Sequence, residues 1–321
     1  MHASDAERPS DHAERMKRAR LSLEGLSLGD AFGECFLRHP RQADAWVRSR
    51  RLPPAPWTYT DDTVMACAVV EVLDRYGYID QDALAEKFAQ RYMQDPTRGY
   101  GANAHAILSA IGQGMAWSAV SRASFGGEGS MGNGAAMRVA PLGAYFAGEF
   151  EATARQARRS AEVTHAHPEG MAGAIAVAVA AAFLAAAPPL PRKDRGHSLL
   201  RTALHFAPKG ATRAGLERAL RLSLNVPLAQ AVAQLGNGSR VTAPDTVPFA
   251  LWCAARHLDS FEDALWSVAA AGGDTDTNGA IVGGLIALSV GLPGLPESWL
   301  AAREPLWLYN HENNDDTRHC P

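Results

Sequence analysis

The stretch that decides the fold is "AAGGDTDTNGAIVGG", residues 270–284. Gly272 and Gly273 end one apolar helix, and Asp274 and Asp276 open a second helix rich in glycine, alanine, isoleucine, valine and leucine. Burying a carboxylate beside so apolar a helix is costly unless the group is paired or bound to a cation. Aspartate and threonine oxygens are hard ligands that suit magnesium, calcium or manganese. The stretch therefore predicts a core helix with an acidic start, which helix capping alone or a bound cation would explain.

Helical periodicity extends from this stretch through most of the chain. In residues 60–77, five apolar residues share one face at helical spacing: Met65, Ala68, Val69, Val72 and Leu73. Residues 79–96 predict an amphipathic helix that Asp80 opens and Pro96 ends. Further helices are expected at 102–114, 134–147, 150–164, 168–184, 196–207, 212–225, 227–236, 246–258, 260–272 and 278–291. No segment alternates apolar and polar residues over the length of a strand, so the sequence predicts an all-α fold.

The helices indicate a single domain over residues 16–309. Residues 185–198 are the best candidate for a linker, but composition does not change across them, and no fixed-period repeat suggests a solenoid. Residues 1–15 and 310–321 are polar, and we expect a disordered N-terminal extension and a polar C-terminal tail.

Composition excludes several classes of protein. Hydrophobic residues make up 47% of the 321 residues and the net charge is -3, which gives no global electrostatic reason to bind nucleic acid or an anionic membrane. The four cysteines form no CxxC pair, so we expect neither a zinc site nor a disulfide framework, and a cytoplasmic location. The longest apolar run, residues 172–187, is shorter than the ~20 residues of a membrane span and predicts a core helix.

A second acidic cluster lies in "WTYTDDT", residues 57–63. Thr60 is a plausible N-cap with Asp61 and Asp62 in the first helical turn, and capping alone would explain these residues. Two such clusters in one chain, without arginines nearby in sequence, are stronger evidence of a shared site. Four carboxylates brought together would repel one another, and two divalent cations about 3.5–4 Å apart would relieve that repulsion.

A glycine-rich stretch, "FGGEGSMGNGAAMRVAPLG" (residues 125–143), precedes a helix expected to begin near Ala135. Free backbone amides at such a loop can bind phosphate, although a flexible loop has the same composition. Asp30 and Glu34 lie four residues apart on a predicted helix and fit either a solvated face or close packing beside Gly29 and Gly33.

In chain order, these segments resemble the ADP-ribosylglycohydrolase family, which includes the dinitrogenase reductase-activating glycohydrolases and the eukaryotic ADP-ribosylhydrolases. The resemblance is carried by "GLSLGDAFGE", "YTDDTVMA", "RGYG", "GSMGNGAAMRVAPLG", "THAHPEGMAGAIAVA" and "GGDTDTNGAIVGGLIAL". It runs from about Leu21 to about Leu308, and the pair of TDDT and GGDTDT motifs is its most specific part. It implies a compact orthogonal bundle of helices with a central site for two Mg²⁺ ions, for which some members substitute Mn²⁺.

The resemblance also implies roles for single residues. The implied metal ligands are Thr60, Asp61, Asp62, Asp274, Asp276 and Thr277, with Asp276 bridging the two ions. The implied contacts to ADP-ribose are Gly99 and Gly101 on the distal-ribose side, Ser130, Met131, Gly132 and Asn133 at the diphosphate, and His165. Several members carry a glutamate eight residues after the glycine of the GD motif, where this chain has Leu37. Either Glu34, one helical turn earlier, takes over that role, or the flap that covers the site works differently in this chain. The candidates for the general base are Asp62 and Glu34.

The resemblance implies a hydrolase that cuts the C1″ glycosidic bond of ADP-ribose attached to a macromolecule and releases ADP-ribose. Arginine-linked ADP-ribose on a protein is the leading substrate. Serine-linked ADP-ribose, O-acetyl-ADP-ribose and ADP-ribosylated nucleic acid stay open, as do a non-catalytic ADP-ribose binder and an immunity protein against an ADP-ribosylating toxin. We expect a monomer that binds no membrane, and nucleic acid only as an ADP-ribosylated substrate.

Overall fold

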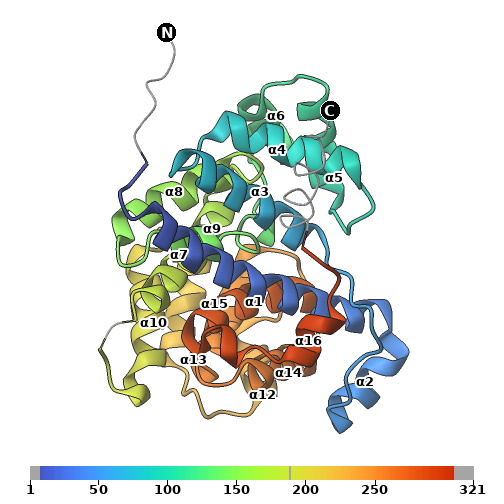
Figure 1. Ribbon diagram of the computed structural model, residues 1–321, viewed down its shortest axis with the longest axis vertical. Coiled ribbons are helices and arrows are strands. Elements are labelled where there is room, and N and C mark those ends of the chain that lie inside the picture. Colours follow the sequence, from blue (N-terminus) through green and yellow to red (C-terminus); the bar gives the residue numbers. More distant parts are fainter. Residues whose placement is uncertain (1–7, 188, 307–321) are drawn as a thin grey trace, which may run out of the picture.

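The computed structural model describes residues 8–187 and 189–306, and within them the chain forms sixteen α-helices, three short 3-10 helices and no β-strand (Figure 1). The prediction of an all-α fold is confirmed. The first eight helices are α1 (His12–Arg38), α2 (Pro40–Ser49), α3 (Asp61–Tyr76), α4 (Gln81–Gln94), α5 (Ala102–Gly112), α6 (Trp117–Ala123), α7 (Ala140–Tyr145) and α8 (Phe150–Glu162). The others are α9 (Pro168–Ala185), α10 (Arg192–Phe206), α11 (Ala211–Arg221), α12 (Leu228–Leu235), α13 (Ala243–Arg256), α14 (Phe261–Ala271), α15 (Thr275–Val290) and α16 (Glu297–Ala302).

The closest helix pair is α1 with α15, which cross the middle of the molecule side by side and antiparallel (Figure 1). Glycines on both helices allow backbone to touch backbone. A Cβ atom added to Gly29 would lie 2.0 Å from the carbonyl oxygen of Gly279, and one added to Gly25 would lie 2.3 Å from that of Gly283. At the same contact, Gly33 lies against Thr275, so the pairing sets the position of the first turn of α15 relative to α1.

The core contains the alanine-rich helix α9, as the sequence predicted. Its 18 residues are long and apolar enough to cross a membrane, but 78% of them are buried against other helices, which is typical of a core helix. The predicted apolar face of α3 is also buried, since Met65, Ala68, Val69 and Leu73 are at most 3% exposed.

Three boundary predictions need correction. The single helix expected at 134–147 is a 3-10 turn (Asn133–Ala135) followed by α7, which begins at Ala140. Pro141 explains the break, because a proline is tolerated in the first helical turn and not further inside. Helix α10 begins at Arg192, inside the expected linker. The N-terminal extension is helical from His12, where Arg15 pairs with Asp11 and Glu149, and residues 1–7 and 307–321 lie outside the described residues.

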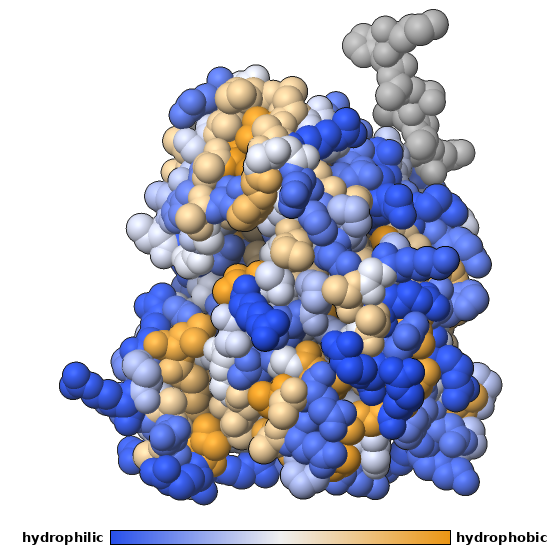
Figure 2. Space-filling view, turned by 180° about the vertical axis from the view of Figure 1, so that it is seen from behind, coloured by the Kyte–Doolittle hydropathy of each residue, from blue (hydrophilic) through white to orange (hydrophobic). Residues whose placement is uncertain are grey.

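Apolar side chains gather on the part of the surface formed by α4, α5 and α6, at the top of the space-filling view (Figure 2). A groove of about 400 Å³ lies there, and the residues that line it include Met93, Met115, Trp117, Asp82 and Glu86. The indole nitrogen of Trp117 donates a hydrogen bond to Asp82 at 2.7 Å.

Candidate functional site

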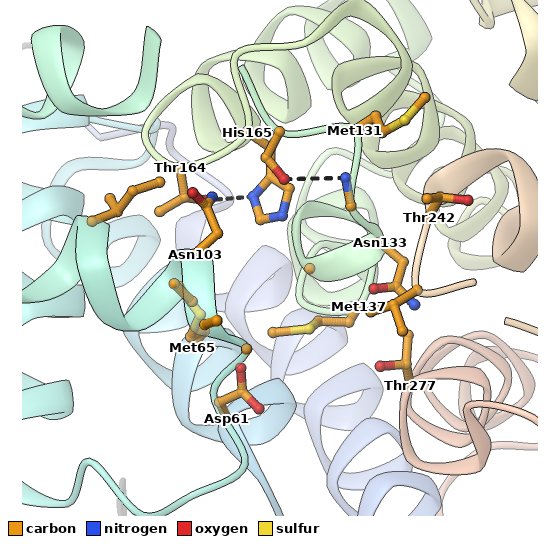
Figure 3. A pocket seen from close by; sticks show the side chains of 18 of the residues that line it. Asp61, Met65, Asn103, Met131, Asn133, Met137, Thr164, His165, Thr242 and Thr277 are labelled. Atoms are coloured by element: carbon orange, nitrogen blue, oxygen red, sulfur yellow. Dashed lines mark hydrogen bonds between the residues drawn. The ribbon is translucent and has the colours of Figure 1, made fainter. Parts of the chain in front are cut away.

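A cavity of about 580 Å³ lies where six segments of the chain meet (Figure 3). Its walls are the first turns of α3 and α15, the loop and helix from Gly99 to Ile107, the glycine-rich segment 125–138, and the residues Thr164 to His167 and Arg240 to Thr242. The two acidic clusters, more than 200 residues apart in sequence, therefore border one space, as the sequence predicted.

Asp30 holds the acidic end of the cavity together, although it does not line the cavity itself. Its fully buried carboxylate accepts hydrogen bonds from the backbone amides of Thr60 and Thr63, both at 3.0 Å to Oδ2. It also accepts from the hydroxyls of Thr60, at 2.9 Å, and Thr63, at 2.6 Å. Burial raises the pKa of Asp30 to about 7 despite these hydrogen bonds. Asp30 thus fixes the first turn of α3 against α1.

Thr60 has the capping role that the sequence suggested. Its backbone is extended and its hydroxyl accepts a hydrogen bond from the amide of Asp62 at 3.3 Å. Asp61 is tied in place from the other side, because its amide donates to the carbonyl oxygen of Arg98 at 2.7 Å. This bond joins the first turn of α3 to the loop that contains Gly99.

The aspartates at the N-terminal ends of α3 and α15 destabilise one another's charged form. Burial, and then the charge of Asp30, raise the pKa of Asp61 to about 8. Burial, followed by the charges of Asp30 and Asp276, raises the pKa of Asp62 well above its usual range. The pKa of Asp276 is also raised well above its usual range, by burial and then by the charges of Asp274 and Asp30, with a smaller contribution from Glu34. No arginine or lysine forms an ion pair with these carboxylates within the described residues.

Two carboxylate oxygens in this cluster, Oδ1 of Asp62 and Oδ1 of Asp276, are buried without a hydrogen-bond partner. Unsatisfied buried acceptors of like charge are costly, and a cation would satisfy both. The donor set is all oxygen, which fits a hard divalent cation. No three Asp, Glu, His or Cys side chains in residues 8–187 and 189–306 converge into a closed metal cage. A bound cation would therefore also need threonine hydroxyls, water or a change of rotamer.

The opposite wall of the cavity is the glycine-rich segment. The hydroxyl of Ser130 accepts a hydrogen bond from the amide of Gly132 at 3.2 Å, which curls the chain into a tight loop. A Cβ atom added to Gly132 would lie 3.1 Å from the imidazole of His165, and one added to Gly134 would lie 2.9 Å from it, so these positions have little room for a side chain. Asn133 connects this wall to the acidic end, because its Nδ2 donates to Oδ2 of Asp274 at 2.6 Å and to the hydroxyl of Thr246 at 3.0 Å.

The loop at residues 236–242, which contacts both the acidic wall and the glycine-rich wall of the cavity, was not identified from the sequence. The carbonyl oxygen of Asn237 accepts from the amide of Asp274 at 3.2 Å and from Nδ2 of Asn278 at 2.7 Å. At its other end, Thr242 pairs with Gly132 in an antiparallel bridge. Its sequence, "GNGSRVT", carries a Gly-Asn-Gly turn signal between two helices that could have identified it as more than a connection.

The structure places most of the predicted site residues on the cavity wall. Those that line it are Asp61, Asp62, Gly99, Gly101, Ser130, Met131, Gly132, Asn133, His165, Asp274, Asp276 and Thr277. Thr60 and Glu34 do not line it. Glu34 instead accepts a hydrogen bond from Nε of Arg38 at 2.6 Å, one turn further along α1.

The same arrangement of motifs is found in known proteins. The sequence pattern of the ADP-ribosylglycohydrolase family matches residues 11–316. The chain belongs to this family. ADP-ribosylhydrolase ARH3 from Mus musculus is 31% identical over 326 residues, which cover 89% of this chain and 87% of the relative, and the Homo sapiens protein is 30% identical.

Two further relatives of the ADP-ribosylglycohydrolase family extend the comparison. ADP-ribosylarginine hydrolase Tri1 from Serratia proteamaculans is 25% identical over 313 residues, covering 90% of this chain and 75% of the relative. A solved ADP-ribosylglycohydrolase-related protein complex superposes with a TM-score of 0.62 at 26% identity, covering 91% of this chain and 94% of the other. The family consists of metal-dependent hydrolases, and this chain is a glycohydrolase enzyme.

Proposed function

We propose that the protein is a magnesium-dependent hydrolase that cleaves the C1″ glycosidic bond of ADP-ribosyl-arginine on a protein and releases ADP-ribose. The observation that supports this proposal most is the pairing of two walls in one cavity. One wall holds buried carboxylates with two unpartnered oxygens, and the other is a glycine-rich loop that lines the same cavity. An ADP-ribose unit has the chemistry to contact both, through its ribose hydroxyls and its diphosphate.

In this proposal, residues from two helix starts would hold two Mg²⁺ ions, or Mn²⁺ as a substitute: Asp61 and Asp62 from α3, and Asp274, Asp276 and Thr277 from α15. When bound, such ions would orient the ribose hydroxyls and lower the pKa of a bound water. Thr60 would be a ligand at the edge of the site, since it does not line the cavity and its hydroxyl donates a hydrogen bond to Asp30.

The chain's own residues position the bond that breaks. Asp62 is the better candidate for the general base, because it lines the cavity with a free Oδ1, whereas Glu34 is held by Arg38 away from the cavity wall. Asp62 would accept a proton from the attacking water. The C1″–N bond to arginine would break as a C1″–O bond forms, through a transition state with oxocarbenium character. The arginine would leave as its guanidine and take up a proton.

The choice of arginine rests on a relative that is named an ADP-ribosylarginine hydrolase. The more similar ARH3 proteins carry no linkage in their names, so serine-linked ADP-ribose, O-acetyl-ADP-ribose and ADP-ribosylated nucleic acid stay as competing substrates. Under the immunity-protein alternative, removing residues 1–15 would weaken binding to a toxin while small-substrate turnover stays unchanged.

The test is a panel of arginine-, serine- and nucleotide-linked ADP-ribose substrates, each assayed with Mg²⁺ and with EDTA. We expect turnover of the arginine-linked substrate that requires Mg²⁺ and is lost in Asp62→Asn and Asp276→Asn. Asp263→Asn is the matched control, since Asp263 also lies in a first helical turn but pairs with Arg50 outside the cavity. Near-normal turnover by Asp276→Asn, or equal turnover in EDTA, would contradict the proposal.

A further inference from the structure

At the glycine-rich wall of the cavity, three side chains form a buried hydrogen-bonded chain: Arg138, Thr164 and His165. Nη2 of Arg138 donates to the hydroxyl oxygen of Thr164 at 2.9 Å, and that oxygen lies 2.7 Å from Nδ1 of His165. Arg138 and Thr164 are at most 1% exposed and His165 is 9% exposed. Figure 3 shows the imidazole between Thr164 on one side and the segment of Met131 and Asn133 on the other.

The direction of each hydrogen bond in this chain follows from donor and acceptor chemistry. An arginine can only donate, so the Thr164 oxygen accepts from Arg138 and keeps its own hydrogen to give. Within the described residues, the Thr164 hydroxyl has no acceptor other than Nδ1 of His165. Donation to Nδ1 therefore satisfies the buried hydroxyl, whereas a protonated Nδ1 would leave it without an acceptor. The second Nη2 hydrogen of Arg138 is used at the carbonyl oxygen of Ser160, at 2.9 Å.

We propose that Arg138 and Thr164 are positioning residues that lock His165 in the tautomer with a bare Nδ1 and a protonated Nε2, so that Nε2–H is a fixed donor to an anionic oxygen in the cavity. Nε2 faces the glycine-rich wall, since a Cβ atom on Gly132 or Gly134 would lie 3.1 Å from it. It makes no hydrogen bond to any described residue, so its hydrogen is free for a ligand.

The alternative states of His165 would harm anion binding or cost free energy. With Nδ1 protonated, Nε2 would turn a lone pair toward the same wall and repel an anionic oxygen. A doubly protonated ring would place a second buried cation beside Arg138. Burial, and then the charge of Arg138, lower the pKa of His165 to about 3, so the ring is neutral at pH 7. Arg138 keeps its proton at that pH, because burial lowers its pKa only to about 9.

That the accepted oxygen belongs to a diphosphate rests on the proposed function, whereas the tautomer does not. The first experiment therefore uses the wild-type full chain with ¹⁵N-labelled histidine and no ligand. A long-range ¹H–¹⁵N correlation spectrum, with His165 assigned by its loss in His165→Gln, reports the state of each ring nitrogen. We expect a bare Nδ1 and a protonated Nε2 throughout pH 6–8. A protonated Nδ1, alone or together with Nε2, would overturn the inference.

The second experiment separates positioning from simple packing. Thr164→Val keeps the shape of the side chain and removes the hydroxyl, and Thr164→Ser keeps the hydroxyl and removes a methyl group. We expect Thr164→Val to bind ADP-ribose about tenfold more weakly by calorimetry, as for the loss of a hydrogen bond to a charged group, with KM rising and kcat nearly unchanged. Thr164→Ser should stay within about twofold of wild type and keep the wild-type ring spectrum.

The outcomes distinguish this inference from the proposed function. If the spectrum is as expected but wild type fails to bind ADP-ribose, the proposed function fails and the tautomer assignment stands. If Thr164→Val loses the fixed tautomer yet binds ADP-ribose as tightly as wild type, the positioning role is wrong. Should Thr164→Val not fold, the serine variant still decides, because tenfold weaker binding there would show that the methyl packing and not the hydroxyl matters.

Discussion

Substituting Gly29 by alanine tests whether the contact between α1 and α15 sets the geometry of the acidic site. The added Cβ would lie 2.0 Å from the carbonyl oxygen of Gly279, and 2.6 Å from its carbonyl carbon. Both are backbone atoms inside a helix, so no side-chain rotation can relieve the overlap and the two helices must separate. Overpacking of a core costs about 1–3 kcal/mol, and we expect the upper end of that range here.

The size of the change in melting temperature follows from the entropy of unfolding. About 2 cal/mol/K per residue over roughly 300 residues gives about 0.6 kcal/mol/K, so a loss of about 3 kcal/mol lowers the melting temperature by about 5 °C. Separation of α1 from α15 would also move Asp276 away from Asp30 and Asp62. Turnover should therefore fall more than the change in folded fraction explains.

Gly112→Ala is the matched control, since Gly112 is the last residue of α5 and its added Cβ would meet Met93 at an ordinary 3.6 Å. It should leave turnover unchanged and stabilise the protein by about 0.5 kcal/mol through the entropy of the unfolded chain. Differential scanning calorimetry and steady-state kinetics on both variants make the comparison. A melting temperature for Gly29→Ala within about 1 °C of wild type would refute the reasoning.

Three further predictions concern the carboxylates. Asp30→Asn should lower the melting temperature by several degrees, because an amide cannot accept all the hydrogen bonds from Thr60 and Thr63; a stable variant by calorimetry would contradict the anchoring role. Because the folded-state pKa values of Asp30 and Asp61 are raised to about 7 and about 8, EDTA-treated protein should lose stability as the pH rises from about 6.5 to 8, where His165 is neutral in both the folded and the unfolded chain; a melting temperature that rises over this range would oppose the assignment. Mg²⁺ should raise the melting temperature in a concentration-dependent way, more at pH 8 than at pH 6, and Asp276→Asn should abolish that rise in a thermal-shift titration.

The helical fold and the two acidic helix starts could be predicted because their signals are local. Periodic apolar residues report one buried face of a helix, and Asp61, Asp62, Asp274 and Asp276 each lie at a recognisable helix start. The break before Pro141 was also readable in the sequence, since proline rarely continues a helix, and the expected helix at 134–147 ignored that signal.

Other features depend on tertiary packing that no local pattern reports. Asp30 and Glu34 have the same i, i+4 spacing whether they face solvent or the core, and only the seating of α3 on α1 shows that Asp30 is fully buried while Glu34 pairs with Arg38. The chain from Arg138 to Thr164 joins residues 26 positions apart through a hydroxyl that the sequence cannot orient.

The loop at residues 236–242 and the bond from Asn133 to Asp274 have a consequence for how ligands affect one another. They join the glycine-rich wall to the acidic wall through a few short hydrogen bonds. A ligand bound at one wall can therefore change the affinity of the other wall for its own ligand, and thermodynamic linkage requires this effect to be reciprocal. If ADP-ribose at one wall changes the affinity of the other wall for a divalent cation by some factor, the cation changes the affinity for ADP-ribose by that same factor. The affinity for ADP-ribose measured with and without the cation, and the affinity for the cation measured with and without ADP-ribose, should therefore give the same coupling factor.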